Sequence, residues 1–402
     1  GRFHHLLLVG KAFYDLREHW DDYNLLPNYQ SFNSAEAPLS FGSDDIFGFL
    51  DPDEGAEHGA LDIGVGRYAV RKSWEMDILL RRERIYHTPA HWGTWLTRAV
   101  MLADDEDNLA YMTGSDSMAV RIEKERKDIQ VKRLYIDAFQ QENRWENSYY
   151  PAVNRELNRQ MNQGAYLLNY IGHGSRLKFG NEEFFTLKDA TSWRNLERLP
   201  ILLAASCSFA GSDWEEKVTL GRDMLFMPQG GSIAIIAASR LTYNYSNQLF
   251  NSHLLRSIFP GAKAPQYHAL GDAVRMAKNK TPGNENRSKY ALLGNPALPL
   301  PNFAAKVQLS TLNGAPLRGL ADTLRGGQKV TCEVEVTLPD GRPMEGEAHL
   351  QIRGAQQKVR TRNNDGEGVF EYLERPYTLF RGKATCTEGK ARFTFIVPTD
   401  MD

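Results

Sequence analysis

The chain has 402 residues, of which 42% are hydrophobic and 24% charged. This composition is typical of a globular protein, and the length suggests two or three domains. The formal net charge of −2 gives no reason to expect a nucleic-acid partner or an anionic membrane surface. No apolar run approaches the ~20 residues that a membrane-spanning helix needs. The chain begins at once with the strand-like GRFHHLLLVG and no signal peptide, so we expect a fragment of a longer protein.

Up to about residue 300, apolar strand-like runs alternate with charged amphipathic segments. The expected strands fall within residues 4–10, 59–70, 98–107, 132–139, 165–174, 201–208 and 231–239, and the clearest helical segments are 74–88 and 149–164. Strands rich in Leu, Ile, Val and Ala that alternate with helices indicate an α/β fold. We therefore predict a mostly parallel sheet with helices on both faces.

The pattern changes near residue 303. The remaining residues show strand-like alternation broken by turn signals, as in GGQKVTCEVEVTLPDGRP and KARFTFIVPTD. A stretch of about 100 residues of this kind predicts a small β-sandwich. Cys332 and Cys386 both fall in its strand-like segments, and the sequence leaves open whether they form a disulfide or stay separate thiols.

His173 and Cys207 each follow a predicted strand, in LLNYIGHGS and ILLAASCSFAG. Functional groups of an open α/β sheet collect at the carboxyl ends of its strands. If the two strands are neighbours, the imidazole can activate the thiol as a nucleophile. The N–H groups of Gly174 and Cys207 are then candidates for an oxyanion hole. The alternative is an inert buried thiol and a structural histidine.

The segment GAYLLNYIGHGSRLKFGNEEFFTLKDATSWRNLERLPILLAASCSFAGSDW resembles the core of the gingipain family of cysteine peptidases. SDDIFGFLDPDEG, GGSIAIIAASR and YALLGNPALPL match the same family in the same order. The resemblance implies a caspase-like fold followed by an immunoglobulin-like domain. It divides the chain into part of a non-catalytic subdomain (1–95), a catalytic subdomain (96–302) and an immunoglobulin-like β-sandwich (303–402).

The C-terminal NNDGEGVFEYLERPYTLFRGKATCTEGKARFTFIVPTDMD is similar to the region that follows the peptidase domain in the PorU-type signal peptidases of type IX secretion. That resemblance implies a sortase-like transpeptidase on the bacterial cell surface, at the extracellular face of the outer membrane. Its substrates would be cargo proteins with a C-terminal secretion signal, its acceptor lipopolysaccharide, and its partners outer-membrane proteins of the secretion complex. A secreted gingipain-like endopeptidase and a non-catalytic scaffold of a secretion complex remain alternatives.

The resemblance also implies roles for acidic residues in LADDEDNLAYMTGSDS. Glu106, or its neighbour Asp105, would orient the catalytic histidine, and Asp116 would line the primary specificity pocket. PorU-type enzymes are not expected to require a basic residue there, and an acidic run is otherwise a solvated loop. Tyr243, which follows another strand end, is a candidate for the wall of the substrate cleft.

The loop GSDDIFGFLDPDEG places four carboxylates close together in the sequence. Carboxylate oxygens at this density suit Ca²⁺, and gingipains carry structural calcium. The predicted ligands are Asp44, Asp45, Asp51 and Asp53, although the spacing is not that of an EF-hand and a solvated turn is the alternative. The proposed thiol chemistry itself requires no cofactor.

Overall fold

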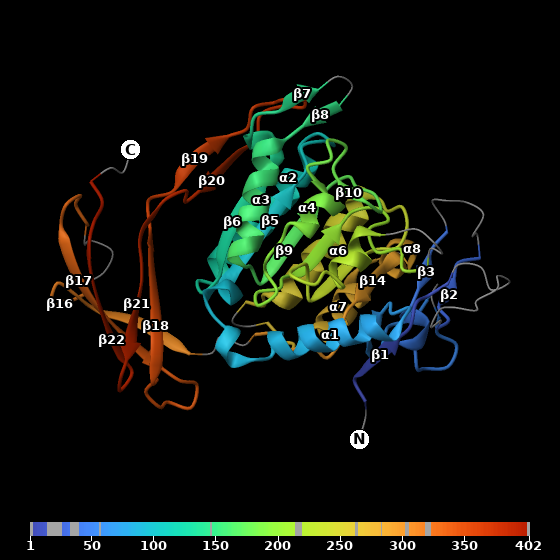
Figure 1. The fold of residues 1–402 in the computed structure, drawn as a ribbon, viewed down its shortest axis with the longest axis horizontal. Coiled ribbons are helices and arrows are strands. Elements are labelled where there is room, and N and C mark those ends of the chain that lie inside the picture. The colour runs from blue at the N-terminus through green and yellow to red at the C-terminus, as the bar shows by residue number, and fades with distance from the viewer. Residues whose placement is uncertain are drawn as a thin grey trace. The chain divides into compact units, whose positions relative to one another are not determined.

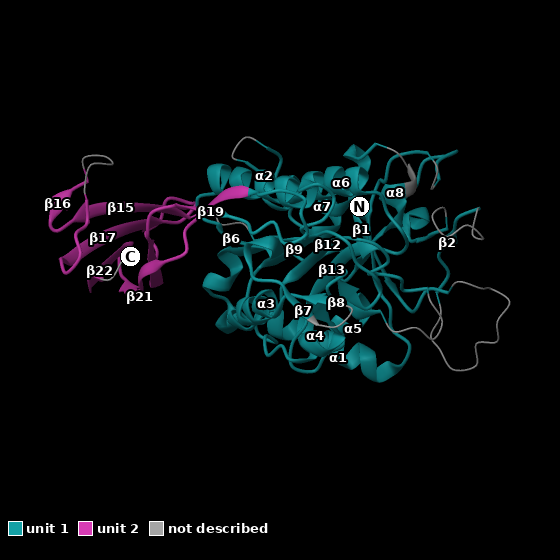
Figure 2. Ribbon diagram, turned by 90° about the horizontal axis from the view of Figure 1, so that it is seen from above, with its two compact units in different colours: residues 1–301, 360–370 teal, residues 302–359, 371–402 magenta. Residues whose placement is uncertain are grey.

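The fold is described from a computed structural model of the chain. The described residues are 3–13, 26–32, 40–55, 58–144, 147–213, 219–261, 264–282, 284–301, 305–317 and 323–399. They form two compact units (Figure 2), the first made of residues 1–301 and 360–370, the second of residues 302–359 and 371–402. Within these described ranges, no helix is both long and apolar enough to cross a membrane.

The first unit contains an eight-stranded sheet (Figure 1). Its strands, in spatial order, are β1 (His5–Val9), β4 (Gly64–Tyr68), β14 (Tyr290–Leu293), β13 (Ala234–Ala238), β12 (Ile201–Ala205), β9 (Leu167–Ile171), β5 (Arg98–Ala103) and β6 (Gln130–Tyr135). All neighbouring pairs are parallel except β13 and β14. The predicted mostly parallel sheet is therefore confirmed, and the antiparallel step at β14 is an addition to it.

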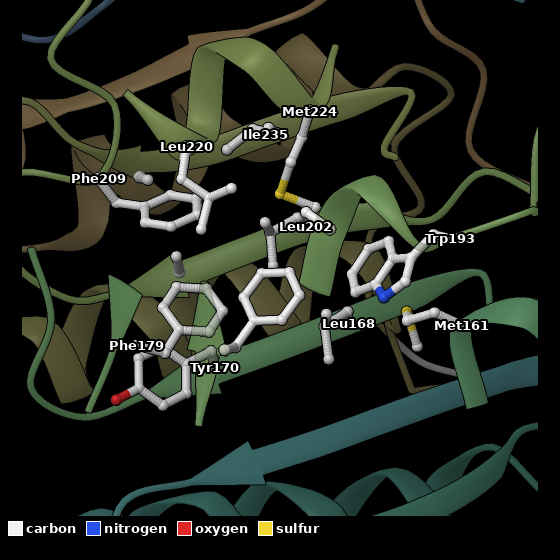
Figure 3. Packing of buried hydrophobic residues seen from close by; sticks show 14 of the residues in the cluster. Met161, Leu168, Tyr170, Phe179, Trp193, Leu202, Phe209, Leu220, Met224 and Ile235 are labelled. Atoms are coloured by element: carbon white, nitrogen blue, oxygen red, sulfur yellow. The ribbon is translucent and has the colours of Figure 1, made fainter. Parts of the chain in front are cut away.

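Helices cover both faces of this sheet (Figure 2). One layer contains α1 (Ser73–Tyr86), α3 (Pro151–Gln163), α4 (Leu187–Thr191) and α5 (Leu220–Met224), and the opposite layer contains α2 (Ala110–Glu125), α6 (Asn244–Ile258) and α7 (Leu270–Lys280). The layer that contains α3 packs on alternate residues of the central strands. Figure 3 shows this core, in which Leu168, Leu202 and Ile235 lie among the aromatic rings of Tyr170, Phe179 and Trp193.

Shorter elements connect these layers. The two-stranded pairs are β2 (Tyr29–Gln30) with β3 (Gly42–Ser43), β7 (Glu142–Arg144) with β8 (Asn147–Tyr149), and β10 (Lys178–Phe179) with β11 (Phe185–Thr186). A short α8 (Asn284–Lys289) precedes β14, and the 3₁₀ turns are Asp45–Phe47, Pro89–His91, Thr94–Thr97 and Ile136–Ala138. The β10–β11 pair matters for the site because it follows directly from the loop that carries His173.

The second unit is antiparallel β structure, which confirms the predicted sandwich. Four strands form one sheet, in the order β16 (Ala315–Pro316), β15 (Lys306–Leu312), β17 (Lys329–Thr337) and β22 (Lys390–Ile396). The remaining pairs are β18 (Gly346–Arg353) with β21 (Thr378–Cys386), and β19 (Gln357–Arg360) with β20 (Glu371–Glu374). Alternate residues of β17 and β22 form a core on which the side chains of β18 and β21 pack. Cys332 and Cys386 are buried in it as free thiols, not as a disulfide.

The division into two units falls one residue before the predicted boundary at 302/303, but residues 360–370 belong to the first unit. Asp137 fixes this returning segment, because its carboxylate accepts the N–H groups of Asn363 and Asn364, both at 2.8 Å. No division of the described residues falls near 95, since β1 and β4 share the sheet with the strands of the predicted catalytic subdomain. The subdomain boundary at 95 stays a prediction.

The core in Figure 3 gives the first testable prediction. Leu202 is fully buried in the middle of β12, so Leu202→Ala removes packed atoms and leaves a cavity. We expect a loss of about 2–5 kcal/mol in the free energy of unfolding, measured by urea denaturation. Val120→Ala, at a position 50% exposed on α2, is the control and should stay within about 0.5 kcal/mol of the wild type. Equal losses in both variants would contradict this account of the core.

Candidate active site

Three neighbouring strands, β5, β9 and β12, end at the same level of the sheet. Ala103 pairs with Ile171, and Ile171 pairs with Ala205, so the last residues of the three strands lie side by side. His173 follows β9 by two residues, and Cys207 follows β12 by two residues. The loop after β5 carries the acidic run from Asp104 to Asp107. The predicted adjacency of the two strands therefore holds, and a third strand adds the acidic groups.

The backbone of His173 is fixed by a buried carboxylate. Oδ2 of Asp104 accepts the N–H of His173 at 2.7 Å, and the hydroxyl of Tyr170 donates to the carbonyl oxygen of His173. Gly172 adopts a φ of +156°, and a Cβ there would lie 2.3 Å from Cβ of Asp104. Only glycine lets the chain pass this close to Asp104. Burial, followed by the nearby Glu182 carboxylate, raises the pKa of Asp104 well above its usual range.

The imidazole of His173 faces two carboxylates of the loop after β5. Nε2 lies 3.0 Å from Oε2 of Glu106 and 3.6 Å from Oδ1 of Asp107. Asn181 donates its amide to both carboxylate oxygens of Glu106, at 2.8 and 3.0 Å, and Tyr111 packs edge-on against the imidazole. Glu106 thus occupies the place expected for the orienting acid, with its carboxylate on Nε2 of the ring.

Asp105 does not share that place. Its Oδ2 accepts the hydroxyl of the buried Tyr150, and burial raises the pKa of Asp105 to about 8. The loop is also strained, because Asp107, Asn108 and Leu109 have φ values of +59°, +53° and +64°. Three consecutive non-glycine residues in this region are costly and are typical of functional sites.

The thiol of Cys207 is half-buried and lies against Thr242, which follows β13. The N–H of Thr242 donates to Sγ at 3.4 Å, and the carbonyl and hydroxyl oxygens of Thr242 each lie 3.7 Å from Sγ. Ser208, next in the chain, has a φ of +55°, so the nucleophile precedes a strained turn.

Two backbone N–H groups are available for an oxyanion hole. Gly174 and Phe179 form an antiparallel β-bridge whose two hydrogen bonds are made by their neighbours. The N–H of Ser175 donates to the carbonyl of Lys178 at 3.0 Å, and the N–H of Gly180 donates to the carbonyl of His173 at 2.9 Å. The N–H of Gly174 itself is not used in such a pair. Within the described part of the chain, the N–H of Cys207 makes no backbone–backbone hydrogen bond. Both predicted donors are thus free to bind an oxyanion.

A pocket of about 210 Å³ adjoins these donors, lined by Gly174, Ser175, Arg176, Leu177, Ser208 and Leu241. Asp116, the predicted pocket carboxylate, is not among its lining residues. It lies on α2, where it forms an ion pair with Arg133 at 2.7 Å and accepts the Tyr135 hydroxyl at 3.1 Å. The carboxylate thus neutralises a buried arginine, and the expected specificity role of Asp116 stays a prediction.

Tyr243, the predicted wall of the substrate cleft, is 56% exposed. Its N–H donates to Oδ1 of Asn286 at 3.0 Å, and Nζ of Lys289 lies 5.6 Å from the centre of its ring. It follows directly after Thr242, the residue that contacts the thiol. A role in substrate binding stays a prediction.

The four aspartates predicted to bind calcium do not form one cluster in the structure. Asp44 forms an ion pair with Arg67 at 2.6 Å, and Asp45 forms one with Lys278 at 2.5 Å. These two carboxylates are thus neutralised by basic side chains of the chain, and calcium binding there stays a prediction. Asp51 instead lies near Glu54 and Asp62, and Asp53 occupies a left-handed turn position with a φ of +67°.

Four residues of the site were not predicted from the sequence. Asp104 acts on the histidine backbone, Asp107 on its ring, Asn181 on Glu106 and Thr242 on the thiol. Asp104 and Asp107 belong to the same acidic run as Glu106, so the run itself was a usable signal. Asn181 and Thr242 are distant from these residues along the chain, and only the fold brings them to the site. No local sequence pattern identifies them.

Comparison with known proteins agrees with this geometry. Residues 1–301 match Peptidase family C25. The chain therefore belongs to peptidase family C25, which is a family of cysteine peptidases. No curated protein is a significant match to the chain.

Solved structures similar to this chain include gingipains. The crystal structure of the Arg-specific cysteine proteinase gingipain R (RgpB) is similar with a TM-score of 0.58 and 16% identity, over 99% of this chain and 79% of that one. The complex of the pro- and mature domains of RgpB from Porphyromonas gingivalis is similar with a TM-score of 0.56 and 16% identity, over 99% of this chain and 80% of that one. Dimeric latent PorU from the same organism has a TM-score of 0.36 and 18% identity, over 98% of this chain and 33% of that one. The gingipain structures establish the shared fold.

The geometry predicts that the reactivity of Cys207 depends on His173. Without a nearby base, only a few per cent of a thiol is thiolate at pH 7. We therefore expect the iodoacetamide alkylation rate of Cys207 at pH 7, followed by mass spectrometry, to fall about tenfold or more in His173→Ala. Cys332 and Cys386 are internal controls, because burial raises the pKa of both thiols. Equal rates at Cys207 in the two proteins would contradict the dyad.

Glu106 gives a second prediction for the site. Glu106→Gln keeps the shape of the side chain but removes the charge next to Nε2, so the imidazolium loses its partner. We expect the alkylation rate of Cys207 to fall several-fold. Glu183→Gln is the matched control, since Glu183 is a nearby exposed residue that pairs with Lys178 at 2.9 Å. A loss of the same size in the control, or none in Glu106→Gln, would exclude Glu106 as the orienting acid.

Proposed function

We propose that the chain catalyses acyl transfer through a thioester on Cys207. The observation that carries this proposal is the common level at which β5, β9 and β12 end, because it brings a carboxylate, an imidazole and a thiol to one edge of the sheet. This is the arrangement that a cysteine nucleophile needs: a base within reach and a third group that orients the base.

In the first half-reaction, His173 takes the proton of the Cys207 thiol, and the sulfur attacks the carbonyl carbon of the scissile peptide. The N–H groups of Gly174 and Cys207 hold the developing oxyanion. The carbon–nitrogen bond then breaks, and the imidazolium gives its proton to the leaving amine. Glu106 stabilises the positive ring during this step. The products are a thioester on Cys207 and a free amine.

In the second half-reaction, an acceptor attacks the thioester. His173 removes the proton from the incoming amine, hydroxyl or water as the bond to the carbonyl carbon forms, and the carbon–sulfur bond breaks. The sulfur leaves as a thiolate and recovers its proton from the imidazolium. Water as acceptor gives hydrolysis, whereas an amine or hydroxyl acceptor gives transpeptidation.

We propose that the substrates are cargo proteins of type IX secretion, whose C-terminal signal is removed and whose new C-terminus passes to lipopolysaccharide. The resemblance of residues 363–402 to PorU-type enzymes supports this substrate class. The pocket beside the site also supports it, because its lining includes Arg176 and no carboxylate. Such a pocket does not favour the basic side chain that an Arg-specific peptidase binds.

This function implies the cell surface as the location, on the extracellular face of the outer membrane, and proteins of the secretion complex as partners. It requires no cofactor for the chemistry. Structural calcium near Asp51 stays a prediction.

The function is tested with a cargo protein that carries a type IX C-terminal signal, incubated with the enzyme and hydroxylamine as a small acceptor. We expect the wild type to release the signal and to leave a hydroxamate on the cargo, identified by intact-protein mass spectrometry. Cys207→Ala should release no signal, and Asp116→Asn should leave the cleavage position unchanged. Water as the acceptor would give a carboxylate in place of the hydroxamate.

Other outcomes separate the alternatives. Rapid degradation of unfolded casein with a sharp preference for one residue before the cut would indicate a gingipain-like endopeptidase instead. A Cys207 that forms no acyl product and resists alkylation would indicate a scaffold of a secretion complex.

A further inference from the structure

A second group of carboxylates lies beside the proposed catalytic residues and takes no part in the reaction described above. Asp104 and Asp105 follow β5, and Glu182 lies in the turn between β10 and β11. One carboxylate oxygen from each of the three lies within 4.8 Å of the others. All three side chains are buried, with residue exposures of 0%, 3% and 7%.

Two carboxylate oxygens of this cluster are buried and have no partner in the described part of the chain. Among the described residues, neither Oδ1 of Asp105 nor Oε2 of Glu182 has a hydrogen-bond partner. Buried oxygens of this kind are costly unless a donor or a cation satisfies them. Both belong to residues that are more than nine-tenths buried, so bulk water does not satisfy them.

Three other buried carboxylates are neutralised by basic side chains of the chain. Asp45 pairs with Lys278, Glu75 with Arg222, and Asp213 with Arg240. The main charges acting on Asp104, by contrast, are the carboxylates of Glu182, Asp105 and Glu106, and Asp365 adds to the negative field at Glu182. Like charges packed together in a buried site need a counter-ion or protons.

We propose that Asp104, Asp105 and Glu182 bind a hard divalent cation, Ca²⁺ or Mg²⁺, next to the backbone of His173. Carboxylate oxygens are the ligands that these ions prefer, and the two unsatisfied oxygens supply coordination positions. The same Asp104 carboxylate holds the N–H of His173 at 2.7 Å. The cation would therefore fix the loop after β5 against the turn that carries Glu182, and with it the position of the catalytic base.

The proposal is tested on the full chain after treatment with a chelator. Ca²⁺ and Mg²⁺ are titrated separately by isothermal calorimetry, and the melting temperature is measured with and without each ion. For the wild type we expect binding and a rise of about 3–5 °C at a cation concentration a hundred times the dissociation constant. The readout is independent of catalytic activity, so it stands or falls separately from the proposed acyl transfer.

Variants locate the site. Asp105→Asn/Glu182→Gln should bind one cation fewer than the wild type and should melt no lower than the cation-free wild type, because two repelling charges are gone. Glu183→Gln, a change at the next residue on an exposed side chain, should bind as many cations as the wild type. Asp51→Asn should keep this site, even if the cluster near Glu54 and Asp62 binds an ion of its own.

Two results would overturn the proposal. One is a wild type that takes up neither cation at millimolar concentration, which would mean that protons alone neutralise the cluster. The other is an Asp105→Asn/Glu182→Gln variant that folds and binds as many cations as the wild type. If the double variant does not fold, the wild-type titration still decides the first outcome, and Glu182→Gln alone decides the second.

Discussion

The common register of β5, β9 and β12 is the constraint on which the site depends. Parallel strands that end at the same level deliver their following residues to one edge of the sheet. Ala103, Ile171 and Ala205 are the paired residues at that level. A shift of one residue in either pairing would reverse the face on which a whole strand buries its side chains. The fully buried, apolar central strands therefore fix the relative positions of the acid, the base and the nucleophile.

The residues just beyond the strands show how closely this edge is packed. A side chain at Gly172 would collide with Asp104, and a side chain at Gly174 would lie 2.4 Å from Oγ of Ser206. The acidic loop after β5 and the turn after Cys207 contain non-glycine residues with positive φ. Such strain persists only where the surrounding packing holds it in place. The closely packed core under β9 and β12 provides that support.

Hydrophobic pattern was sufficient to predict the strands and the adjacency of β9 and β12, because buried parallel strands read as short apolar runs. It did not predict β14 (Tyr290–Leu293), since four residues give little signal of a strand and none of its direction. The roles of the charged residues were harder to predict from the sequence. Asp116 and Asp44 look like free acids in the sequence, but Arg133 and Arg67 neutralise them. The arginines are distant along the chain, and only the fold shows the pairing. Cys332 and Cys386 likewise required the packing to show separate thiols.

The acidic groups around His173 divide into two sets with different physical effects. Glu106 and Asp107 are partly exposed and face the ring, so they stabilise the imidazolium while solvent screens their charge. Asp104, Asp105 and Glu182 are buried and act through the backbone and through space. Burial raises the pKa of Asp104 and Asp105, so these carboxyl groups resist ionisation unless a counter-charge is present. The proposed cation would supply that charge, and it would also hold the loop after β5 against the turn that carries Glu182.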